Sequence, residues 1–402
     1  MRFETLLAVT AATLGSAVAQ ENFLLGFNAG ATTDTGTAKT QADFEKEFKT
    51  AKSLQGAPGN FTTIRLYSNI QAGTEQNPQP IAAFGAAVAT NTKLLLGIWA
   101  SGTTSIDGEL SALQAAIKQY GSKLTDLVVG ISVGSEDLYR VSEPGIRNKA
   151  GVGNDADTIV KFIKATRSKL ANTALSKIKV THVDTWTAWV NSSNKAVIDN
   201  VDFVSVNAFP FYESELPNSI DNVASLLSSA LSATEGVAAG KDVWITETGW
   251  AYSGPAFGSA QATVENAGKY WKDVGCAIFG KRNVFWYTLR DANPANEVKF
   301  AITDNLSTKP RYDLSCPVKK DLPSASSSSA SPSGSAGAKA SASPAQTSRA
   351  AAQSGAAGPS ATASGPSSAT PTGNAPGASS VAMVHAMAMG LSVMFAFAAF
   401  AL

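Results

Sequence analysis

Val243-Trp244-Ile245-Thr246-Glu247-Thr248-Gly249-Trp250 is an apolar strand that ends on a carboxylate, followed by a small turn and an aromatic side chain. Burying a glutamate at the end of such a strand is costly unless its carboxylate is hydrogen-bonded or used in chemistry. Residues 127–135 have the same character, and they lead to Glu136. A single strand-end glutamate is more often a salt-bridge partner. Two such strands suggest instead that Glu136 and Glu247 form a carboxylate pair across one cleft.

Eight short apolar segments alternate with segments of helical periodicity. The expected strands are residues 23–27, 62–67, 94–99, 127–136, 178–183, 203–207, 243–246 and 284–289. The expected helices are residues 39–54, 79–90, 107–120, 157–170, 195–200, 219–237 and 260–274. Continuous apolar strands are typical of a parallel sheet that is covered on both faces. Eight such units predict an α/β fold, a closed (β/α)8 TIM barrel. The alternative is a doubly wound open sheet, but no glycine-rich dinucleotide loop follows the first strand.

The ends of the 402-residue chain differ in composition from its middle. Residues 1–19 combine Arg2, an apolar run and Ala17-Val18-Ala19, which is the pattern of a secretory signal peptide. Residues 321–377 consist mainly of Ser, Ala, Pro, Gly and Thr, and cannot bury a core. We therefore expect one folded domain at residues 20–320, followed by a disordered, O-glycosylated linker. Three N-glycosylation sequons agree with secretion, and they begin at Asn60, Asn191 and Asn305.

An apolar tail, residues 378–402, ends the chain. A polar linker, small residues and a terminal apolar tail together are the pattern of a GPI-attachment signal. Asn374 is the expected attachment residue, with Gly373 and Gly377 as alternatives. A C-terminal membrane helix is the other interpretation, because the tail is just long enough to span a bilayer. No basic segment follows the tail, however, so we expect a secreted protein with a GPI lipid anchor in the outer face of the plasma membrane.

Charge, cysteines and histidines exclude several kinds of chemistry. The formal net charge of +1 gives no reason to expect nucleic acid as a partner. In a secreted chain, Cys276 and Cys316 are expected to form a disulfide, which leaves no thiolate nucleophile. His182 and His385 are the only histidines, too few for a His-based metal cluster. No nucleophile-elbow motif supports a Ser-His-Asp triad. We therefore expect no metal and no organic cofactor, and carboxylate chemistry remains.

The C-terminal ends of barrel strands, with the loops after them, build active sites. Carboxylates, amides and aromatic residues gather at the expected strand ends, and they include Asn28, Arg65, Tyr67, Trp99, Glu136, Asp184, Trp186, Asn207, Tyr212, Glu247, Trp250 and Tyr287. Aromatic faces bind sugar rings, and amides and carboxylates bind hydroxyl groups; about half of this set is expected to be structural. Glycosides are hydrolysed by two carboxylates through an oxocarbenium-like transition state. A separation of roughly 5–5.5 Å between Glu136 and Glu247 would define a retaining mechanism.

Four motifs, in this order, resemble glycoside hydrolase family 17, and they are Ile64-Arg65-Leu66-Tyr67, Val133-Gly134-Ser135-Glu136, Val206-Asn207-Ala208-Phe209-Pro210-Phe211-Tyr212 and Trp244-Ile245-Thr246-Glu247-Thr248-Gly249-Trp250. The resemblance covers the whole folded domain, and the Ser-rich tail is similar to that of the family's fungal GPI-anchored branch. The resemblance implies retaining endo-hydrolysis of β-1,3-glucan, with a role in assembling or remodelling the fungal cell wall. We expect a monomer that is held at the plasma membrane and the wall.

The resemblance also assigns roles to residues. Glu136 matches the family's proton donor, and Glu247 matches its nucleophile. Tyr212 is expected to hydrogen-bond the nucleophile, and Arg65 to keep it charged. The remaining residues expected to bind substrate or support the site are Tyr67, Ser135, Asn207, Trp250 and Tyr287. The family usually has Asn before the acid, where a contact to the sugar 2-hydroxyl is expected. The shorter Ser135 puts the efficiency of the enzyme, or its balance between hydrolysis and glucan transfer, in doubt.

Two other functions compete with the hydrolase. A β-1,3-glucanosyltransferase would form the same glycosyl-enzyme, but a sugar hydroxyl would displace it instead of water. A non-catalytic wall protein would only bind glucan, with the Ser-rich linker presenting the barrel. The presence of both strand-end glutamates argues against the non-catalytic alternative.

Overall fold

The computed structural model describes residues 23–317 and 321–325. The expected signal peptide, the linker and the apolar tail with Asn374, Gly373 and Gly377 lie outside the described residues. The proposed domain boundaries and the disordered stalk therefore stay predictions.

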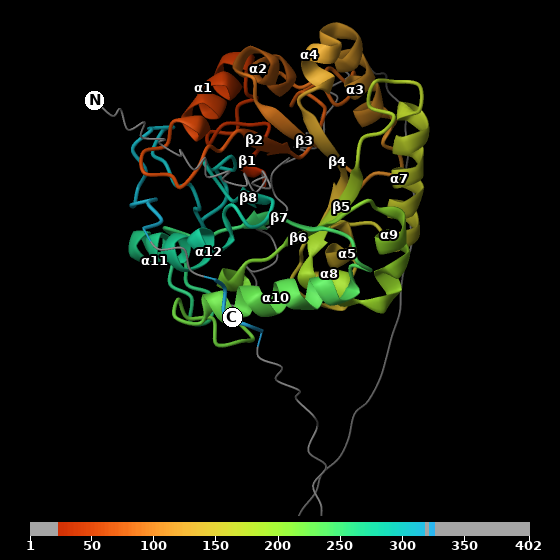
Figure 1. Ribbon diagram of the computed structural model, residues 1–402. Helices are drawn as coiled ribbons and strands as arrows, with labels where there is room; N and C mark the ends of the chain where they lie inside the picture. The colour runs from red at the N-terminus through yellow and green to blue at the C-terminus, as the bar shows by residue number, and fades with distance from the viewer. Residues whose placement is uncertain (1–22, 318–320, 326–402) are drawn as a thin grey trace, which may run out of the picture. The chain divides into compact units, whose positions relative to one another are not determined.

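Eight parallel strands form one closed barrel in chain order (Figure 1). The strands are β1 (Leu25–Ala29), β2 (Thr63–Leu66), β3 (Lys93–Ile98), β4 (Val128–Ser135), β5 (Val180–Thr185), β6 (Val204–Asn207), β7 (Val243–Thr248) and β8 (Val284–Trp286). The ring closes where β1 pairs with β8, with Leu25 opposite Val284. The predicted TIM barrel is confirmed, and the open-sheet alternative is wrong because both edges of the sheet are paired.

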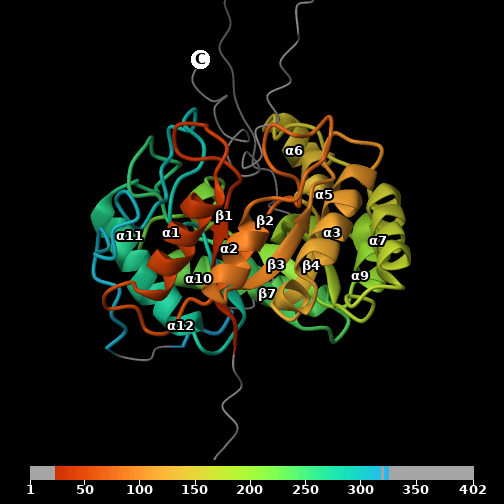
Figure 2. The same cartoon turned by 90° about the horizontal axis from the view of Figure 1, so that it is seen from above.

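Helices cover the outside of the barrel, and Figure 2 shows them around the strands from a second direction. They are α1 (Gln41–Lys52), α2 (Ala83–Thr90), α3 (Asp107–Tyr120), α4 (Ser122–Thr125), α5 (Asp137–Arg140), α6 (Glu143–Arg147), α7 (Ala156–Leu170), α8 (Trp186–Val190), η1 (Ser192–Asn194), α9 (Lys195–Asn200), η2 (Pro210–Tyr212), α10 (Val223–Val237), α11 (Val264–Tyr270), η3 (Trp271–Gly275) and α12 (Cys276–Ile278). Side-chain caps fix several starts. Thr40 and Asp43 form a capping box for α1, and Asp155 caps α7.

A small apolar cluster fills the barrel interior. It consists of Leu95, Phe203, Trp244 and Phe285, all buried. These side chains come from β3, β7, β8 and the residue just before β6, so they meet across the ring rather than on one side of it. The rings of Phe203 and Trp244 lie 4.0 Å apart. The interior is thus a packed core, and chemistry is left to the rim at the C-terminal strand ends.

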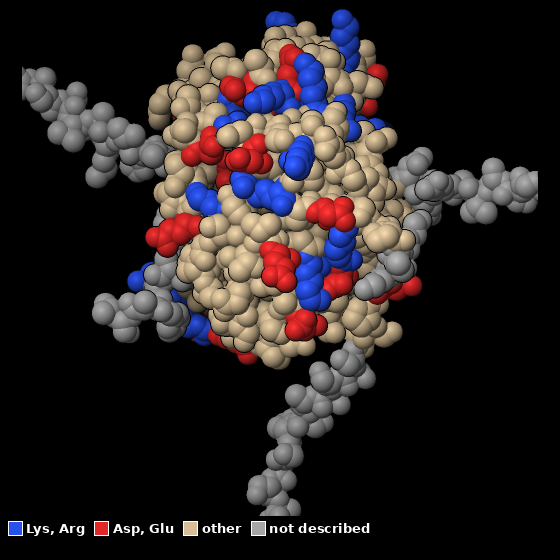
Figure 3. Space-filling model, turned by 90° about the vertical axis from the view of Figure 1, so that its left-hand side faces the viewer, with Lys and Arg blue, Asp and Glu red and all other residues tan. Residues whose placement is uncertain are grey.

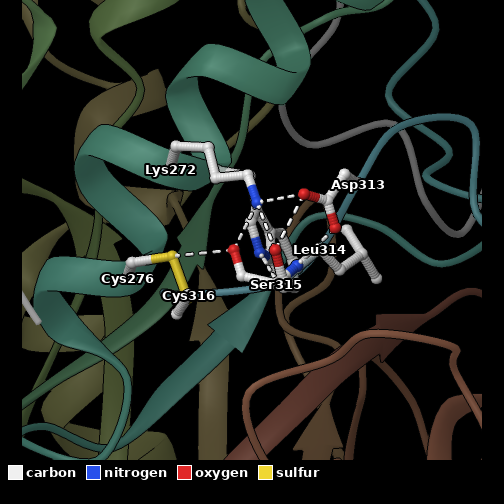
Figure 4. The surroundings of a disulfide bond; sticks show 7 residues. Lys272, Cys276, Asp313, Leu314, Ser315 and Cys316 are labelled. Carbon is white, nitrogen blue, oxygen red and sulfur yellow. Dashed lines mark hydrogen bonds and ion pairs between the residues drawn. A yellow bond between two sulfur atoms is a disulfide. The ribbon is translucent and has the colours of Figure 1, made fainter. Parts of the chain in front are cut away.

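Cys276, the first residue of α12, forms a disulfide with Cys316 near the end of the described domain (Figure 4). Beside it, Lys272 pairs with Asp313 at 2.7 Å and bonds the hydroxyl of Ser315 at 2.9 Å. The disulfide and this ion pair fasten the segment that follows β8 to the last helices.

The surface carries charges of both signs. Figure 3 shows Lys and Arg side chains interspersed with Asp and Glu on the face drawn, as the small net charge would suggest. Among residues 23–317 and 321–325, no helix has the length and apolar character needed to cross a membrane.

Candidate active site

Glu136 follows β4 at a sharp change of backbone direction. Its φ of 60° lies in the left-handed region, which is uncommon for a residue with a side chain. Its N–H donates to the carbonyl of Val183 at 2.8 Å, and its own carbonyl accepts from the N–H of Arg140 at 3.1 Å as α5 begins. The chain therefore turns on this residue, and unusual backbone geometry is often found at functional positions.

The carboxyl group of Glu136 is buried, and its surroundings favour its protonated form. Asn207 Nδ2 donates to its Oε1 at 3.0 Å, and Arg140 lies 3.8 Å from its Oε2. Burial and the nearby charge of Glu247 raise the pKa of Glu136 to about 8, against the opposing effects of Arg140 and Asn207. A buried carboxylic acid that keeps its proton near pH 7 has the property required of a general acid.

The two oxygens of Glu247, on β7, are held differently. Oε1 accepts from Arg65 Nη1 at 2.5 Å and from the hydroxyl of Tyr67 at 2.7 Å. Oε2 is buried and has no hydrogen-bond partner within the described part of the chain. One oxygen is therefore anchored by a cation and a phenol, and the other has its lone pairs available. This arrangement suits a carboxylate nucleophile.

Arg65 joins the strand of Glu247 to the strand of Glu136. Besides Glu247, its Nη1 donates to Asn28 Oδ1 at 2.9 Å, and its Nη2 donates to Ser135 Oγ at 3.0 Å. Asn28 is itself fixed, because its Nδ2 donates to the carbonyl of Thr246 at 3.0 Å. The hydroxyl of Ser135, where the family usually has Asn, thus serves here as an acceptor for the arginine fork.

Asn207, at the end of β6, makes a second connection between the two glutamates. Its Oδ1 accepts from the hydroxyl of Thr246 at 3.0 Å, and its Nδ2 donates to Glu136. The hydrogen bond from the Thr246 hydroxyl fixes the amide oxygen of Asn207, so the amide nitrogen of Asn207 points to Glu136. The residue before Glu247 therefore sets the orientation of the side chain that contacts Glu136.

Three tyrosines lie near the pair. Tyr67 is the tyrosine that donates to Glu247, the role that the sequence had assigned to Tyr212. Burial and the charges of Glu136, Asp291 and Glu247 raise the pKa of Tyr212 well above its ordinary value. Tyr287 lines a narrow cavity together with Asn28 and Tyr67. Burial and the charge of Glu247 also raise the pKa of Tyr287.

Trp250 belongs to the core rather than to the open site. Its side chain is 1% exposed, and its Nε1 donates to the carbonyl of Gln261 at 2.9 Å. Its ring packs against Phe211 and Tyr270. Trp250 therefore supports η2, which carries Tyr212.

Three contributors escaped the sequence-based assignment of roles. Asn28 was recognised only as a polar strand end, although it orients Arg65. Thr246 and Arg140 were overlooked. The spacing of Arg140, four residues after Glu136, is a usable signal because such residues lie on the same helical face. Within residues 23–317 and 321–325, no group of three or more His, Cys, Asp or Glu side chains is arranged to hold a metal ion.

A buried acid and an arginine-anchored carboxylate at the rim of a (β/α)8 barrel define the active site of a glycosidase. The chain belongs to the BtgE/BtgC glycoside hydrolase family, whose sequence model matches residues 26–302.

Named relatives include fungal glucan hydrolases. The chain is 51% identical over 306 residues to the probable glucan endo-1,3-β-glucosidase EglC of Aspergillus oryzae, which covers 76% of this chain and 65% of that protein. It is 30% identical over 286 residues to the glucan 1,3-β-glucosidase of Saccharomyces cerevisiae, covering 69% and 84%. A family 17 β-1,3-glucanosyltransferase from Rhizomucor miehei has a similar structure, with a TM-score of 0.55 and 25% identity, covering 73% of this chain and 98% of that one. The resemblance to family 17 is therefore confirmed.

Proposed function

We propose that the protein is a retaining endo-β-1,3-glucanase that cuts internal (1→3)-β-D-glucosidic linkages of cell-wall glucan. The observation that carries the proposal is the unequal treatment of the two glutamates. Glu136 is buried with its proton, whereas Glu247 is paired with Arg65 and keeps one oxygen without a partner among the described residues. The names of the Aspergillus and yeast relatives support β-1,3-glucan as the substrate.

In the first step, Glu247 Oε2 attacks the anomeric carbon while Glu136 gives its proton to the leaving glycosidic oxygen. The C–O bond breaks, and a glycosyl ester of Glu247 forms. The charge on Glu247, which had helped to raise the pKa of Glu136, is then neutralised. The pKa of Glu136 falls, and its carboxylate can accept a proton from water as that water attacks the ester. Two displacements return the original anomeric configuration.

Two variants separate these roles. Glu247→Gln removes the nucleophile, so turnover of every β-1,3-glucan is expected to be lost while binding of laminari-oligomers is largely kept. Glu136→Gln removes the acid of the first step and the base of the second, so aryl glycosides, whose leaving group needs no protonation, are expected to give a fast first release of the leaving group followed by slow turnover. Full activity of the Glu247→Gln protein on laminarin would overturn the proposal.

Glucan transfer is a second candidate. The similarity to the Rhizomucor glucanosyltransferase favours it, since hydrolysis and transfer share one glycosyl-enzyme and differ only in the acceptor. A reduced β-1,3-glucan oligomer, incubated with the enzyme and analysed by mass, separates the two. Only shorter products mean hydrolysis and a role in cutting the wall. Products longer than the input mean transfer and a role in remodelling it.

The proposal extends to location. The residues expected at the two ends of the chain suggest a secreted protein attached through Asn374, Gly373 or Gly377 to a GPI anchor, held at the plasma membrane and cell wall. The asparagines of the three sequons, Asn60, Asn191 and Asn305, are exposed and could accept glycans. Release of the full-length protein from membranes by phosphatidylinositol-specific phospholipase C tests the anchor. Retention of the protein on the membrane after this treatment would favour the membrane-helix alternative.

A further inference from the structure

His182 is a fully buried histidine beneath the turn that carries Glu136. It lies on β5 and is 0% exposed. Its Nδ1 lies 2.6 Å from the carbonyl oxygen of Val133, and its Nε2 lies 2.9 Å from Asp184 Oδ2. The edge of the ring meets Trp189, with the ring centres 5.7 Å apart. The proposed reaction makes no direct use of this histidine, so its burial beside the acid calls for an explanation.

The partners of the ring determine where its protons are. A carbonyl oxygen only accepts, so Nδ1 must carry a hydrogen. Asp184 already accepts three backbone N–H groups, from Leu138 at 2.9 Å, Tyr139 at 3.2 Å and Thr185 at 2.8 Å. All three of these groups donate, so the oxygens of Asp184 act as acceptors, and the contact at Nε2 requires a donor from the ring as well. Both ring nitrogens therefore carry hydrogen.

We propose that His182 is a positioning residue, a buried imidazolium that holds Asp184 and, through Asp184, the turn that presents the acid Glu136. Asp184 bonds the two residues that follow the turn, and the cation neutralises a carboxylate that would otherwise be buried without a counter-charge. The inference depends on the proposed function only for the role of Glu136 as acid.

The charges around His182 are compatible with an imidazolium. Asp184 stands on the same strand, and Asp137 reaches it from α5, where Asp137 Oδ2 accepts the N–H of Ser135 at 3.0 Å. A Cβ atom added at Gly134 would lie 2.5 Å from Asp137 Oδ2 and 3.0 Å from His182 Nδ1. Arg140 is the other nearby cation, and Glu136 carries its proton. Burial lowers the pKa of His182, but the hydrogen bond to Asp184 and the charges of both aspartates outweigh it and raise the pKa above its ordinary value.

The turn at Glu136, which Asp184 and Asp137 hold, has an unfavourable backbone conformation. Glu136 adopts the left-handed conformation at φ 60°, which is unfavourable for a residue with a side chain. The carboxylates of Asp137 and Asp184 bond backbone N–H groups on either side of it. Loss of the imidazolium would leave both carboxylates facing each other in the interior, and the turn would relax. A displacement of the acid by about 1 Å lowers the rate of catalysis by up to about 100-fold.

Nuclear magnetic resonance of the full-length, wild-type protein tests the protonation state without any assay of activity. The ¹⁵N-labelled chain has two histidines, and His182→Gln identifies the signals of His182. Both ring nitrogens of His182 are expected to show a directly bonded proton from pH 5 to pH 8. A ring nitrogen of His182 that lacks its proton anywhere between pH 5 and pH 8 would overturn the proposal, whether or not the protein cleaves glucan.

Activity against pH tests the positioning role. His182→Gln removes a positive charge near the acid, so the alkaline limit of kcat/KM is expected to move to higher pH and kcat to fall about 10- to 100-fold. Asp184→Asn removes a negative charge that raises the pKa of Glu136, so its alkaline limit is expected at lower pH.

Thr234→Ala is the matched control, because the buried Thr234 hydroxyl bonds, among the described residues, only within α10, to the carbonyl of Ala230. It should lower the melting temperature and leave the pH profile unchanged. If the His182 and Asp184 variants behave like this control, with a lower melting temperature but wild-type kcat and pH limits, the histidine is merely structural and the proposal is wrong.

Discussion

Tyr67 and Arg65 share the task of anchoring a single oxygen of Glu247. Tyr67→Phe removes one of the two bonds and leaves the ring and the arginine in place. Because a hydrogen bond to a charged group contributes about 1.5–3 kcal/mol, we expect kcat to fall roughly 10- to 100-fold with little change in KM. Steady-state kinetics on laminari-oligomers measures this. Tyr252→Phe, at a tyrosine that packs on Arg311 instead, should keep the wild-type kcat. Equal kcat values for both variants would contradict the anchoring role of Tyr67.

The raised pKa of Glu136 makes stability depend on pH. The unfolded chain releases this proton near pH 4.5, whereas the folded protein holds it to about pH 8. The free energy of unfolding therefore falls as pH rises between these values, by up to about 5 kcal/mol at about 1.4 kcal/mol per pKa unit. Glu109, whose pKa burial raises to about 7, acts in the same direction.

Glu136→Gln should flatten this dependence and make the protein more stable than the wild type at pH 8. Urea unfolding at pH 5 and pH 8 checks both statements. A wild-type protein that is equally stable at the two values would show that Glu136 does not hold its proton in the folded state.

At the residue scale, the sequence identified the carboxylates better than their partners. Glu136 and Glu247 stand out because each ends an apolar strand, a pattern that depends only on neighbours in the chain. The donors to Glu247 come from β2 and the residue just after it, and which of Tyr67 and Tyr212 reaches Glu247 depends on side-chain direction across the barrel. The packing of Trp250 against Phe211 and Tyr270 was likewise not visible in the sequence, because these partners lie far from it along the chain or in another element.

At the scale of elements, most strands and helices could be located from periodicity. The helices at residues 107–120 and 195–200 have the expected bounds. The helix expected at residues 260–274 begins at Val264, because the hydroxyl of Thr263 caps it, and it changes to a π-helical turn at Trp271–Gly275. The small residues before this cap fit the helical pattern, so the predicted helix began too early in the chain. The short helix α5 was overlooked because four residues are too few to show a period.

Two glycines in regular elements should respond in opposite ways to alanine. In β3, a Cβ atom at Gly97 would lie 2.2 Å from the carbonyl oxygen of Leu66 and 2.6 Å from Tyr67 Cα. Gly97→Ala is expected to cost about 1–3 kcal/mol by overpacking and to lower kcat, since it pushes the strand end that carries Tyr67.

In α10, a Cβ atom at Gly236 would meet nothing within 4 Å. Gly236→Ala should therefore stabilise the protein by about 0.5–1 kcal/mol through the entropy of the unfolded chain, with kcat unchanged. Thermal unfolding and kinetics of both proteins test the pair. A neutral Gly97→Ala would mean that β2 and β3 can separate without affecting the site.

At the scale of the whole molecule, the disulfide is the one covalent cross-link in the described part of the chain. Cys276 and Cys316 are 40 residues apart. Closing a loop of that size lowers the conformational entropy of the unfolded chain, which stabilises the folded protein by about 4 kcal/mol. Replacing both cysteines with serine should lower the melting temperature markedly and keep kcat near the wild-type value, because the bond joins α12 to the domain end rather than to the rim. An unchanged melting temperature would mean that the Lys272 ion pair fastens this segment by itself.

The barrel architecture could be predicted from the number of strands and their alternation with helices. Eight apolar strands in alternation with helices leave a closed barrel as the natural solution, and the strand ends then identify the rim. The contacts within the interior cluster of Leu95, Phe203, Trp244 and Phe285 could not be predicted in the same way, because its members are spread over residues 95–285. Contacts between residues so far apart are set by the geometry of closure, which no local pattern records.

The seam between β1 and β8 also has a consequence for biosynthesis. Leu25 of β1 pairs with Val284 of β8, so this pairing cannot form until the ribosome has added another 259 residues. At 5–20 residues per second this delay is roughly 10–50 s, during which the growing sheet has two unpaired edges. Exposed strand edges promote association with other chains. Chaperones that shield extended chains are therefore expected to bind the nascent protein until its eighth strand has emerged, and their depletion should reduce yield without altering the activity of the molecules that fold.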